Sequence, residues 1–139
     1  MGKKKILIVV ASYYIEVSEF LLQGAKNHFK TIDNFYEISI KKVPGCFEIP
    51  FTINKENKYD GYVALGCIIR GETYHFELIS NEVTRKVMDL SVNLKKPIGY
   101  GILTCENLEQ ALVRSNPSKG NKGAEAAEAC SQLLRYTSS

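Results

Sequence analysis

The sequence predicts an α/β fold, a three-layer sandwich in which helices cover both faces of a four-stranded parallel sheet. Short, nearly all-apolar segments alternate along the chain with segments of helical periodicity, which is typical of strands joined by crossover helices. The apolar segments are also those expected when both faces of a sheet are buried. With 139 residues the chain has the length of one domain, and we treat residues 1–139 as a single unit.

The four expected strands are short and end where a turn or a helical segment begins. The first follows a basic tip, and its apolar run from Ile6 to Ala11 is too short for a secretory signal and lacks a small-residue cleavage site. The third, GYVALGCII, is apolar throughout, as burial on both faces requires. The expected strands span residues 5–11, 35–41, 61–69 and 97–103.

The expected helices show apolar residues three or four positions apart. The longest carries such a stripe from Phe76 to Leu94, so one of its faces should pack on the sheet. The last is rich in alanine, which permits close approach of another element. The least regular is the second, where β-branched and polar residues mix. The expected helices span residues 16–30, 49–57, 74–95, 105–114 and 122–136.

Composition argues against several classes of protein. No apolar run approaches the roughly 18 residues of a membrane span. The net charge of +3, with acidic residues between the lysines, is unlike the basic stripe of a nucleic-acid-binding protein. The cysteines lack metal-ligand spacing, so we expect no metal site, but reduced, packed thiols and a cytoplasmic location. The cysteines are residues 46, 67, 105 and 130.

Reactive residues collect where the expected strands end, which is the edge at which parallel α/β sheets bind ligands. In GETYH, residues 71–75, the main-chain amides of Glu72 and Thr73 would be free donors at a helix start, a place that binds phosphate. The alternative is that Thr73 is only an N-cap. Neither a Walker loop nor a dinucleotide fingerprint is present.

Two histidines and two cations have more than one interpretation. His75 would lie in the first helical turn, where the helix dipole favours an uncharged imidazole that accepts a proton, although a lone histidine is more often a surface or core residue. His28 has no evident polar partner and is interpreted as structural. Arg114 and Lys122 are either solvated cations at helix ends or groups that bind an anion.

Five stretches together resemble the lumazine synthase (6,7-dimethyl-8-ribityllumazine synthase) family. They run in family order over nearly the whole chain, and their combination is specific although each alone is not. The stretches are LLQGA (21–25), VPGCFEIP (43–50), YDGYVALGCIIRGETYHFE (59–77), PIGYGILTCENLEQALVR (97–114) and GNKGAEAA (120–127).

The resemblance implies a flavodoxin-like fold and a transferase of riboflavin biosynthesis. The family condenses 5-amino-6-(D-ribitylamino)uracil with 3,4-dihydroxy-2-butanone 4-phosphate to give 6,7-dimethyl-8-ribityllumazine, phosphate and water. It uses neither a metal nor an organic cofactor. Two alternatives are a homologue that binds flavin or lumazine without catalysis and a homologue that only forms a shell. Turnover of both substrates distinguishes the enzyme from either.

The resemblance also assigns roles to residues. His75 would be the acid/base, and Arg114 would bind the phosphate together with the amides of Glu72 and Thr73. Tyr13 would stack on the pyrimidine. The other residues implied for the pyrimidine and the ribityl chain are Cys46, Phe47, Glu48, Cys67, Ile68 and Ile69, with Tyr100 and Lys122 from the adjacent subunit.

Some positions depart from the family pattern. Ser12-Tyr13-Tyr14 stands where Arg-Phe-Asn is usual, and Tyr100 replaces a common phenylalanine. Both changes keep a ring for stacking and add a hydroxyl, so affinity should change more than chemistry. Glu72 adds a carboxylate beside the expected phosphate site, and its effect depends on where the side chain points.

Two charged residues beside the expected site are interpreted as supporting ones. Arg70 is left out of the catalytic set, because it can brace the glycine turn by structural pairing. Glu125 lies one turn from Lys122 and is expected to hold that lysine in place.

The family forms pentamers, and many members stack twelve pentamers into an icosahedral shell. We therefore expect a homo-oligomer with active sites at subunit interfaces. The loop from Ser115 to Gly120 carries no insertion, which favours the 60-subunit form, whereas the short N-terminus removes a contact between subunits. Riboflavin synthase is a further partner that the resemblance suggests without deciding.

Overall fold

The computed structural model describes residues 2–32, 35–71 and 75–137. Within them, four strands form one sheet in the order β2-β1-β3-β4, and each neighbouring pair is parallel. The predicted parallel sheet is therefore confirmed. The strands are β1 (Lys4–Ala11), β2 (Tyr36–Val43), β3 (Gly61–Ile69) and β4 (Ile98–Cys105).

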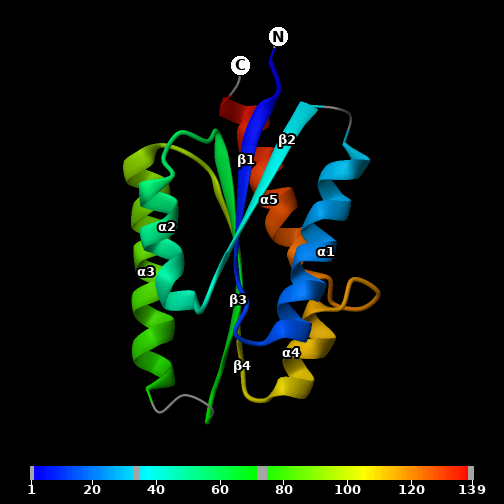
Figure 1. Cartoon of the computed structure of the whole chain (residues 1–139), viewed down its shortest axis with the longest axis vertical. Helices are drawn as coiled ribbons and strands as arrows, with labels where there is room; N and C mark the ends of the chain where they lie inside the picture. The colour runs from blue at the N-terminus through cyan, green and yellow to red at the C-terminus, as the bar shows by residue number, and fades with distance from the viewer. Residues whose placement is uncertain (1, 33–34, 72–74, 138–139) are drawn as a thin grey trace.

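Helices cover both faces of this sheet, which confirms the three-layer sandwich (Figure 1). On one face lie α1 (Ile15–Thr31), α4 (Leu108–Ser115) and α5 (Lys122–Thr137). On the other lie α2 (Ile49–Lys55), which follows a single 3₁₀ turn, and α3 (Phe76–Leu94).

The central strand β1 shows how the sequence builds both apolar layers. Its side chains alternate between two clusters: Ile6 and Ile8 pack with residues of α1 and α5, whereas Leu7 and Val9 pack with residues of α2 and α3. All nine residues of the neighbouring strand β3 are buried. Full burial of each such aliphatic side chain contributes roughly 1.5–3 kcal/mol.

Most elements differ from their predicted ranges by one to three residues at one or both ends, and three of these differences have a clear local cause. Strand β4 continues to Cys105, because that residue still pairs with Ile69 at the end of β3. Helix α4 begins later than expected, since the Asn107 side chain caps it by accepting a hydrogen bond from the Gln110 N–H at 2.9 Å. Helix α2 ends at Lys55 instead of residue 57, where Glu56 leaves the helical conformation.

The small residues of α5 allow the close approach that the sequence suggested. Ala127 and Cys130 are fully buried against the sheet. Opposite them on β4, a Cβ on Gly99 would lie only 1.9 Å from the Ala126 carbonyl oxygen. Glycine at that position is therefore required by the closeness of the helix to the strand.

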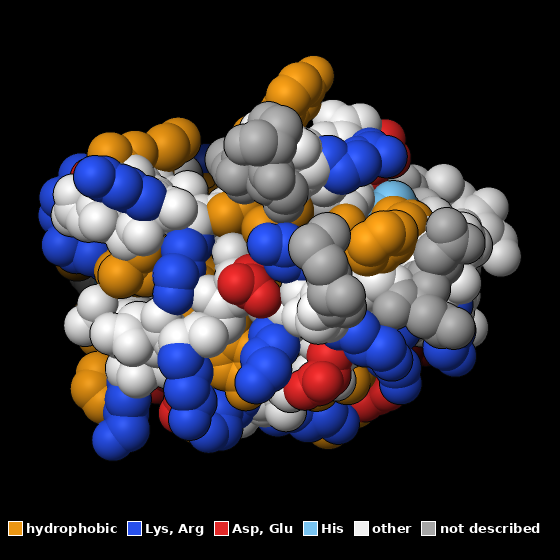
Figure 2. Space-filling model, turned by 90° about the horizontal axis from the view of Figure 1, so that it is seen from above, with side chains coloured by type: hydrophobic (Ala, Val, Ile, Leu, Met, Phe, Trp, Pro, Cys, Tyr) orange, Lys and Arg blue, Asp and Glu red, His pale blue; other side chains and the backbone are white. Residues whose placement is uncertain are grey.

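Basic residues that are far apart in the sequence gather at the amino-terminal edge of the sheet, the upper end in Figure 1. Lys4 and Lys5 begin β1, Lys55 ends α2, and Lys95 caps α3. Figure 2 looks onto this end and shows many lysine and arginine side chains. Carboxyl ends of helices meet there and favour cations. Among the helices in the described residues, none has the length and apolarity to cross a membrane.

Candidate active site

A hollow of about 180 Å³ lies at the carboxyl ends of β1, β2 and β3. It joins five of the residues predicted to bind the pyrimidine, on segments that are up to 55 positions apart in the sequence. Its lining residues are Tyr13, Tyr14, Gly45, Cys46, Phe47, Cys67, Ile68 and Ile79. The edge of the sheet predicted for ligand binding therefore carries a concave surface.

Aromatic rings stand at the rim of this hollow. Tyr13 is 74% exposed, and its ring meets the Tyr14 ring edge-on at a centroid distance of 4.9 Å. Phe47, another residue that lines the hollow, is also exposed. Exposed, supported rings of this kind offer faces on which a planar heterocycle stacks.

The two cysteines that line the hollow are buried and unreactive. Cys46 and Cys67 are buried, and the Cys46 Sγ lies 3.8 Å from the Cys67 carbonyl oxygen. Burial raises the pKa of the Cys46 thiol to about 12, and burial raises the pKa of Cys67 as well. Both groups are therefore protonated at neutral pH, so they serve as walls and not as nucleophiles.

The turn after β2 is held by its own glutamate. The Gly45 N–H donates to the Glu48 Oε1 at 2.9 Å, and the Glu48 N–H donates to the Gly45 carbonyl at 3.2 Å. These two bonds fix the 3₁₀ turn Cys46–Glu48 and direct Phe47 outward. Glu48 thus lies beside the hollow but is not among its lining residues.

His75 lies at the start of α3 and is exposed to solvent. The prediction placed it inside the first helical turn, which is wrong: its backbone, with φ −122° and ψ 54°, is not helical, so it is the N-cap residue. Its carbonyl accepts a hydrogen bond at 3.1 Å from the N–H of Ile79, which lines the hollow. His75 therefore stands one helical turn before a wall of the hollow.

Of the residues predicted to bind phosphate, Arg114 alone lies within the described chain, because Glu72 and Thr73 fall outside it. Arg114 is in the last turn of α4, and its guanidinium extends back to the end of β4. Its Nη1 lies 3.5 Å from the Thr104 carbonyl oxygen and 3.6 Å from the Cys105 Sγ. The cation thus stands at the same carboxyl edge of the sheet.

Arg70 makes the structural pairing that the sequence suggested. Its Nε lies 3.1 Å from the Glu106 carboxylate, and its Nη1 is paired with Glu77. Its guanidinium also lies over the Phe76 ring, 4.4 Å from the centroid. Neither glutamate was predicted from the sequence as a partner of Arg70. Glu77 could have been, because it lies only seven residues downstream at the start of the helix, whereas nothing in the sequence points to Glu106.

Besides Glu48, three more of the residues predicted for the pyrimidine and the ribityl chain do not line the hollow within one chain. Ile69 is 1% exposed and packs in the apolar layer under α1 and α5. Tyr100 is in the middle of β4, where its hydroxyl is 2.6 Å from the Thr84 Oγ1. Lys122 begins α5 and forms an ion pair with Glu125 at 3.2 Å, as predicted.

His28 has a polar partner that the sequence did not reveal. Its Nε2 lies 3.1 Å from the Ser131 Oγ, which joins α1 to α5. Burial lowers the pKa of His28, with smaller and opposing influences from Glu128 and Arg135. This position between α1 and α5, away from the hollow, fits the interpretation of His28 as a structural residue.

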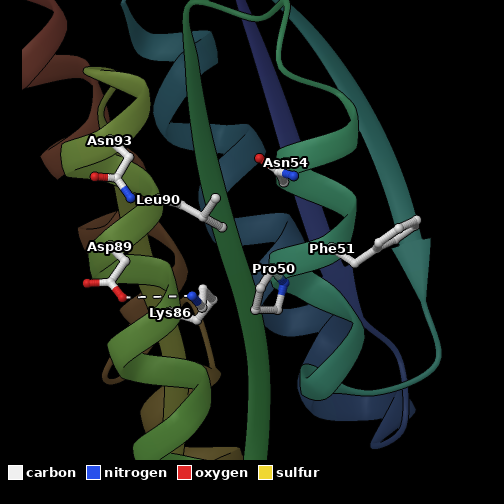
Figure 3. Close-up of a pocket in the computed structure, with 7 residues that line it drawn as sticks. All are labelled: Pro50, Phe51, Asn54, Lys86, Asp89, Leu90 and Asn93. Atoms are coloured by element: carbon white, nitrogen blue, oxygen red, sulfur yellow. Dashed lines mark ion pairs between the residues drawn. The ribbon is translucent and has the colours of Figure 1, made fainter.

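A groove continues from the hollow along the surface between α2 and α3. Phe47 lines both the hollow and a depression of about 190 Å³, which leads to a wider one of about 350 Å³. In Figure 3 the Phe51 ring points away from the α3 side chains, and Lys86 and Asp89 form an ion pair at 3.9 Å. The wider depression is lined by Pro50, Phe51, Asn54, Lys86, Asp89, Leu90 and Asn93.

The described residues contain no group of three or more histidine, cysteine or acidic side chains that could hold a metal ion. All four cysteines are free and buried. The lining of the hollow combines two tyrosines with apolar side chains and main-chain groups, and the Glu48 carboxylate and the His75 imidazole stand beside it; such a combination suits the binding of organic substrates.

Comparison with known proteins relates these features to a family. A family model described as 6,7-dimethyl-8-ribityllumazine synthase matches residues 3–138. A protein of that name from Bartonella tribocorum is 49% identical over 131 residues, which are 91% of this chain and 85% of the relative. Another, from Agrobacterium fabrum, is 44% identical and covers 96% of this chain and 95% of the relative. A third, from Novosphingobium aromaticivorans, is 46% identical with 94% of each chain covered. The chain belongs to the 6,7-dimethyl-8-ribityllumazine synthase family.

Proposed function

We propose that this protein condenses 5-amino-6-(D-ribitylamino)uracil with 3,4-dihydroxy-2-butanone 4-phosphate to form 6,7-dimethyl-8-ribityllumazine, a step of riboflavin biosynthesis. Family membership over nearly the whole chain supports this activity. The observation that carries the proposal is the hollow, because five of its eight lining residues lie in two of the stretches that resemble the family, VPGCFEIP and YDGYVALGCIIRGETYHFE.

The pyrimidine substrate is proposed to occupy the hollow. Tyr13 would stack on the planar ring, and the thiols of Cys46 and Cys67 would exclude water beneath it. Main-chain groups of Cys67, Ile68 and Ile69 would meet the ring edge, which requires no exposure of the buried Ile69 side chain. Glu48 has one carboxylate oxygen engaged by Gly45, and the other would accept hydrogen bonds from ribityl hydroxyls.

The phosphorylated ketone is proposed to lie between His75 and Arg114. The planar guanidinium of Arg114 offers several N–H donors to phosphate oxygens, and its contacts with Thr104 and Cys105 are long enough to be exchanged for a ligand. The amides of Glu72 and Thr73 are proposed as the remaining phosphate donors. Together they would hold the leaving group at the amino end of α3.

His75 is proposed to move the protons of the reaction. The uracil's 5-amino group attacks the ketone, and loss of one water gives an imine. Removal of the proton from the hydroxyl-bearing carbon lets phosphate leave and gives an enol, which takes up a proton to become a ketone. Attack of the ribitylamino nitrogen on that ketone closes the ring with loss of a second water. Each step transfers a proton, for which an exposed imidazole beside the hollow is suited.

We further propose that the site is completed by a second copy of the chain. Tyr100 and Lys122 do not line the hollow of their own chain, although the family resemblance assigns them to it. The groove between α2 and α3 and the exposed side chains of Phe51, Met88 and Val92 support an interface on this face. The proposed assembly is a pentamer, further arranged as a 60-subunit shell.

The proposed location is the cytoplasm, where four free thiols stay reduced. Riboflavin synthase is proposed as the enzyme that receives the product. Co-sedimentation of the two purified proteins tests that association, and separate sedimentation at micromolar concentrations would contradict it.

Steady-state kinetics with two histidine variants tests the catalytic proposal. His75→Ala should lower kcat by about ten- to a thousandfold, because a general acid/base contributes about that much. His28→Gln is the matched control, since His28 lies away from the hollow and should leave kcat within about twofold of wild type. Arg114→Ala should raise the KM of the phosphate substrate. Equal activity of all four proteins would contradict these roles.

A further inference from the structure

We propose that Arg70 is a positioning residue for this site. Its guanidinium joins the end of β3, the start of α3 and the turn after β4, and thereby sets where His75 stands relative to the hollow. The inference rests on the proposed function, because it concerns the same reaction. Arg70 itself is not proposed to touch either substrate.

The main chain of Arg70 is anchored in the sheet. Arg70 follows β3 directly, and its N–H donates to the Cys105 carbonyl at 2.9 Å, which extends the β3–β4 pairing by one residue. The side chain therefore starts from a fixed point. From there it reaches two other elements of the carboxyl edge.

One element is the first turn of α3. Phe76 and Glu77 come directly after His75, and Arg70 holds both, the ring by stacking at 4.4 Å and the carboxylate by an ion pair. The Phe76 side chain is itself buried in the apolar layer beneath α2 and α3. Because Ile79 lies in the following turn and lines the hollow, a shift of this helix start would move His75 and a wall of the hollow together.

The other element is the turn between β4 and α4. The Arg70 Nε lies 3.1 Å from the Glu106 carboxylate, and the Glu106 N–H donates to the Gln110 Oε1 at 2.9 Å. This turn follows Thr104 and Cys105, the residues that Arg114 contacts. Arg70 thus links the segment that carries the proposed acid/base to the strand end beside the proposed phosphate ligand.

Stability alone does not account for this arrangement. The side chains of Arg70, Glu77 and Glu106 are 47%, 65% and 59% exposed, and exposed ion pairs contribute little to stability because solvent screens them. Geometry does account for it, because separate nitrogens of one rigid plane bind separate carboxylates while the face stacks on a ring. A lysine ammonium has no planar face that could stack on the Phe76 ring, and it reaches one carboxylate at a time.

Charge gives Arg70 a second effect on the same site. Without it, Glu77 and Glu106 would stand unpaired at the edge where a phosphate is proposed to bind. The hydrogen bond from Arg70 is the main cause of the lowered pKa of Glu77, so that carboxyl is ionised as well as paired. Loss of Arg70 should therefore raise the KM of the phosphate substrate in addition to lowering kcat.

The test compares Arg70→Gln and Arg70→Lys with a matched control, Arg85→Gln. Arg85 is an exposed arginine on α3 that also pairs with two carboxylates, Glu82 at 2.7 Å and Asp89 at 3.4 Å. Arg70→Gln should lower kcat by about ten- to a hundredfold, because displacements near 1 Å cost about that much. It should also raise the KM of the phosphate substrate and leave the KM of the pyrimidine within about threefold.

Two further variants separate position from charge. Arg70→Lys should bring the KM of the phosphate substrate close to the wild-type value without restoring kcat, because lysine returns the positive charge but not the planar guanidinium. Adding Glu77→Gln to Arg70→Gln should likewise improve KM without restoring kcat. Arg85→Gln should match wild type in all constants, and every variant should melt within about 2 °C of it.

Several outcomes would overturn the inference. They are Arg70→Gln kinetics equal to those of Arg85→Gln, full recovery of kcat by lysine, or a melting temperature lowered by Arg70→Gln well beyond the Arg85→Gln value. The wild-type protein separates this inference from the proposed function. If wild type forms no lumazine, the proposed function fails; if wild type is active and Arg70→Gln is unimpaired, only the positioning role fails.

Discussion

Replacement of Gly66 by alanine should deform the hollow and strain the core beneath it. An alanine Cβ at this position of β3 would lie 2.6 Å from the Cys46 Sγ and 3.1 Å from the Ala11 Cβ. Because favourable contacts between such atoms begin near 3.5 Å, the turn that carries Cys46 and Phe47 has to move by about 1 Å. Overpacking of this kind costs about 1–3 kcal/mol, which lowers the melting temperature by roughly 3–15 °C for a chain of this size.

Gly101→Ala on β4 provides a matched control. Its Cβ would lie 2.7 Å from the Leu65 Cδ2 and 3.0 Å from the Ala126 Cβ, on the face of the sheet that α5 covers. Thermal unfolding at equal protein concentration should show a loss for both variants. Only Gly66→Ala should raise the KM of the pyrimidine substrate, by about tenfold, or 1.4 kcal/mol. A Gly66→Ala protein with wild-type melting and wild-type KM would refute the reasoning.

Three further predictions concern single groups. The pKa of His28 is lowered from 6.5 by burial, so its stabilising contribution is present above pH 6.5 and is lost as pH falls through the folded-state value. His28→Gln should therefore flatten the dependence of the unfolding free energy on pH between about pH 7.5 and pH 5, and urea titrations that show the wild-type slope would contradict this. Tyr100→Phe removes the 2.6 Å bond to Thr84 and should cost about 0.5–1.5 kcal/mol while the stacking ring remains, so a kcat lowered more than about threefold would point to a role for the hydroxyl. Burial raises the pKa of Cys46 and of Cys130 to about 12, so a thiol reagent at pH 8 should label the native protein far more slowly than the denatured protein, and equal labelling rates would contradict this.

Much of the fold follows from patterns that the sequence displays openly. The wholly apolar strand GYVALGCII predicted a strand buried on both faces, and β3 is buried along its whole length. The stripe beginning at Phe76 predicted which face of the long helix would pack, and Val83, Val87 and Leu90 are buried as that stripe requires. Boundaries were less predictable, since the end of β4 depends on its pairing with Ile69, a contact between segments far apart in the chain.

The candidate site was also predictable only in part. The meeting of Tyr13, Cys46 and Cys67 was predictable, because parallel strands end at one edge of the sheet. The links from Arg70 to Glu106 and from His28 to Ser131 were not, since they join residues 36 and 103 positions apart with no periodic signal. The gathering of lysines at the opposite edge likewise arises only when the strands are aligned (Figure 2).

The central claim is tested most directly by supplying the purified protein with both substrates and following lumazine absorbance and phosphate release together. The proposed function predicts that lumazine and phosphate appear in equal amounts, faster than in an enzyme-free blank, and only when both substrates are present. Tight binding of lumazine without formation of product above the blank would contradict it and would favour a homologue that binds the compound without catalysis.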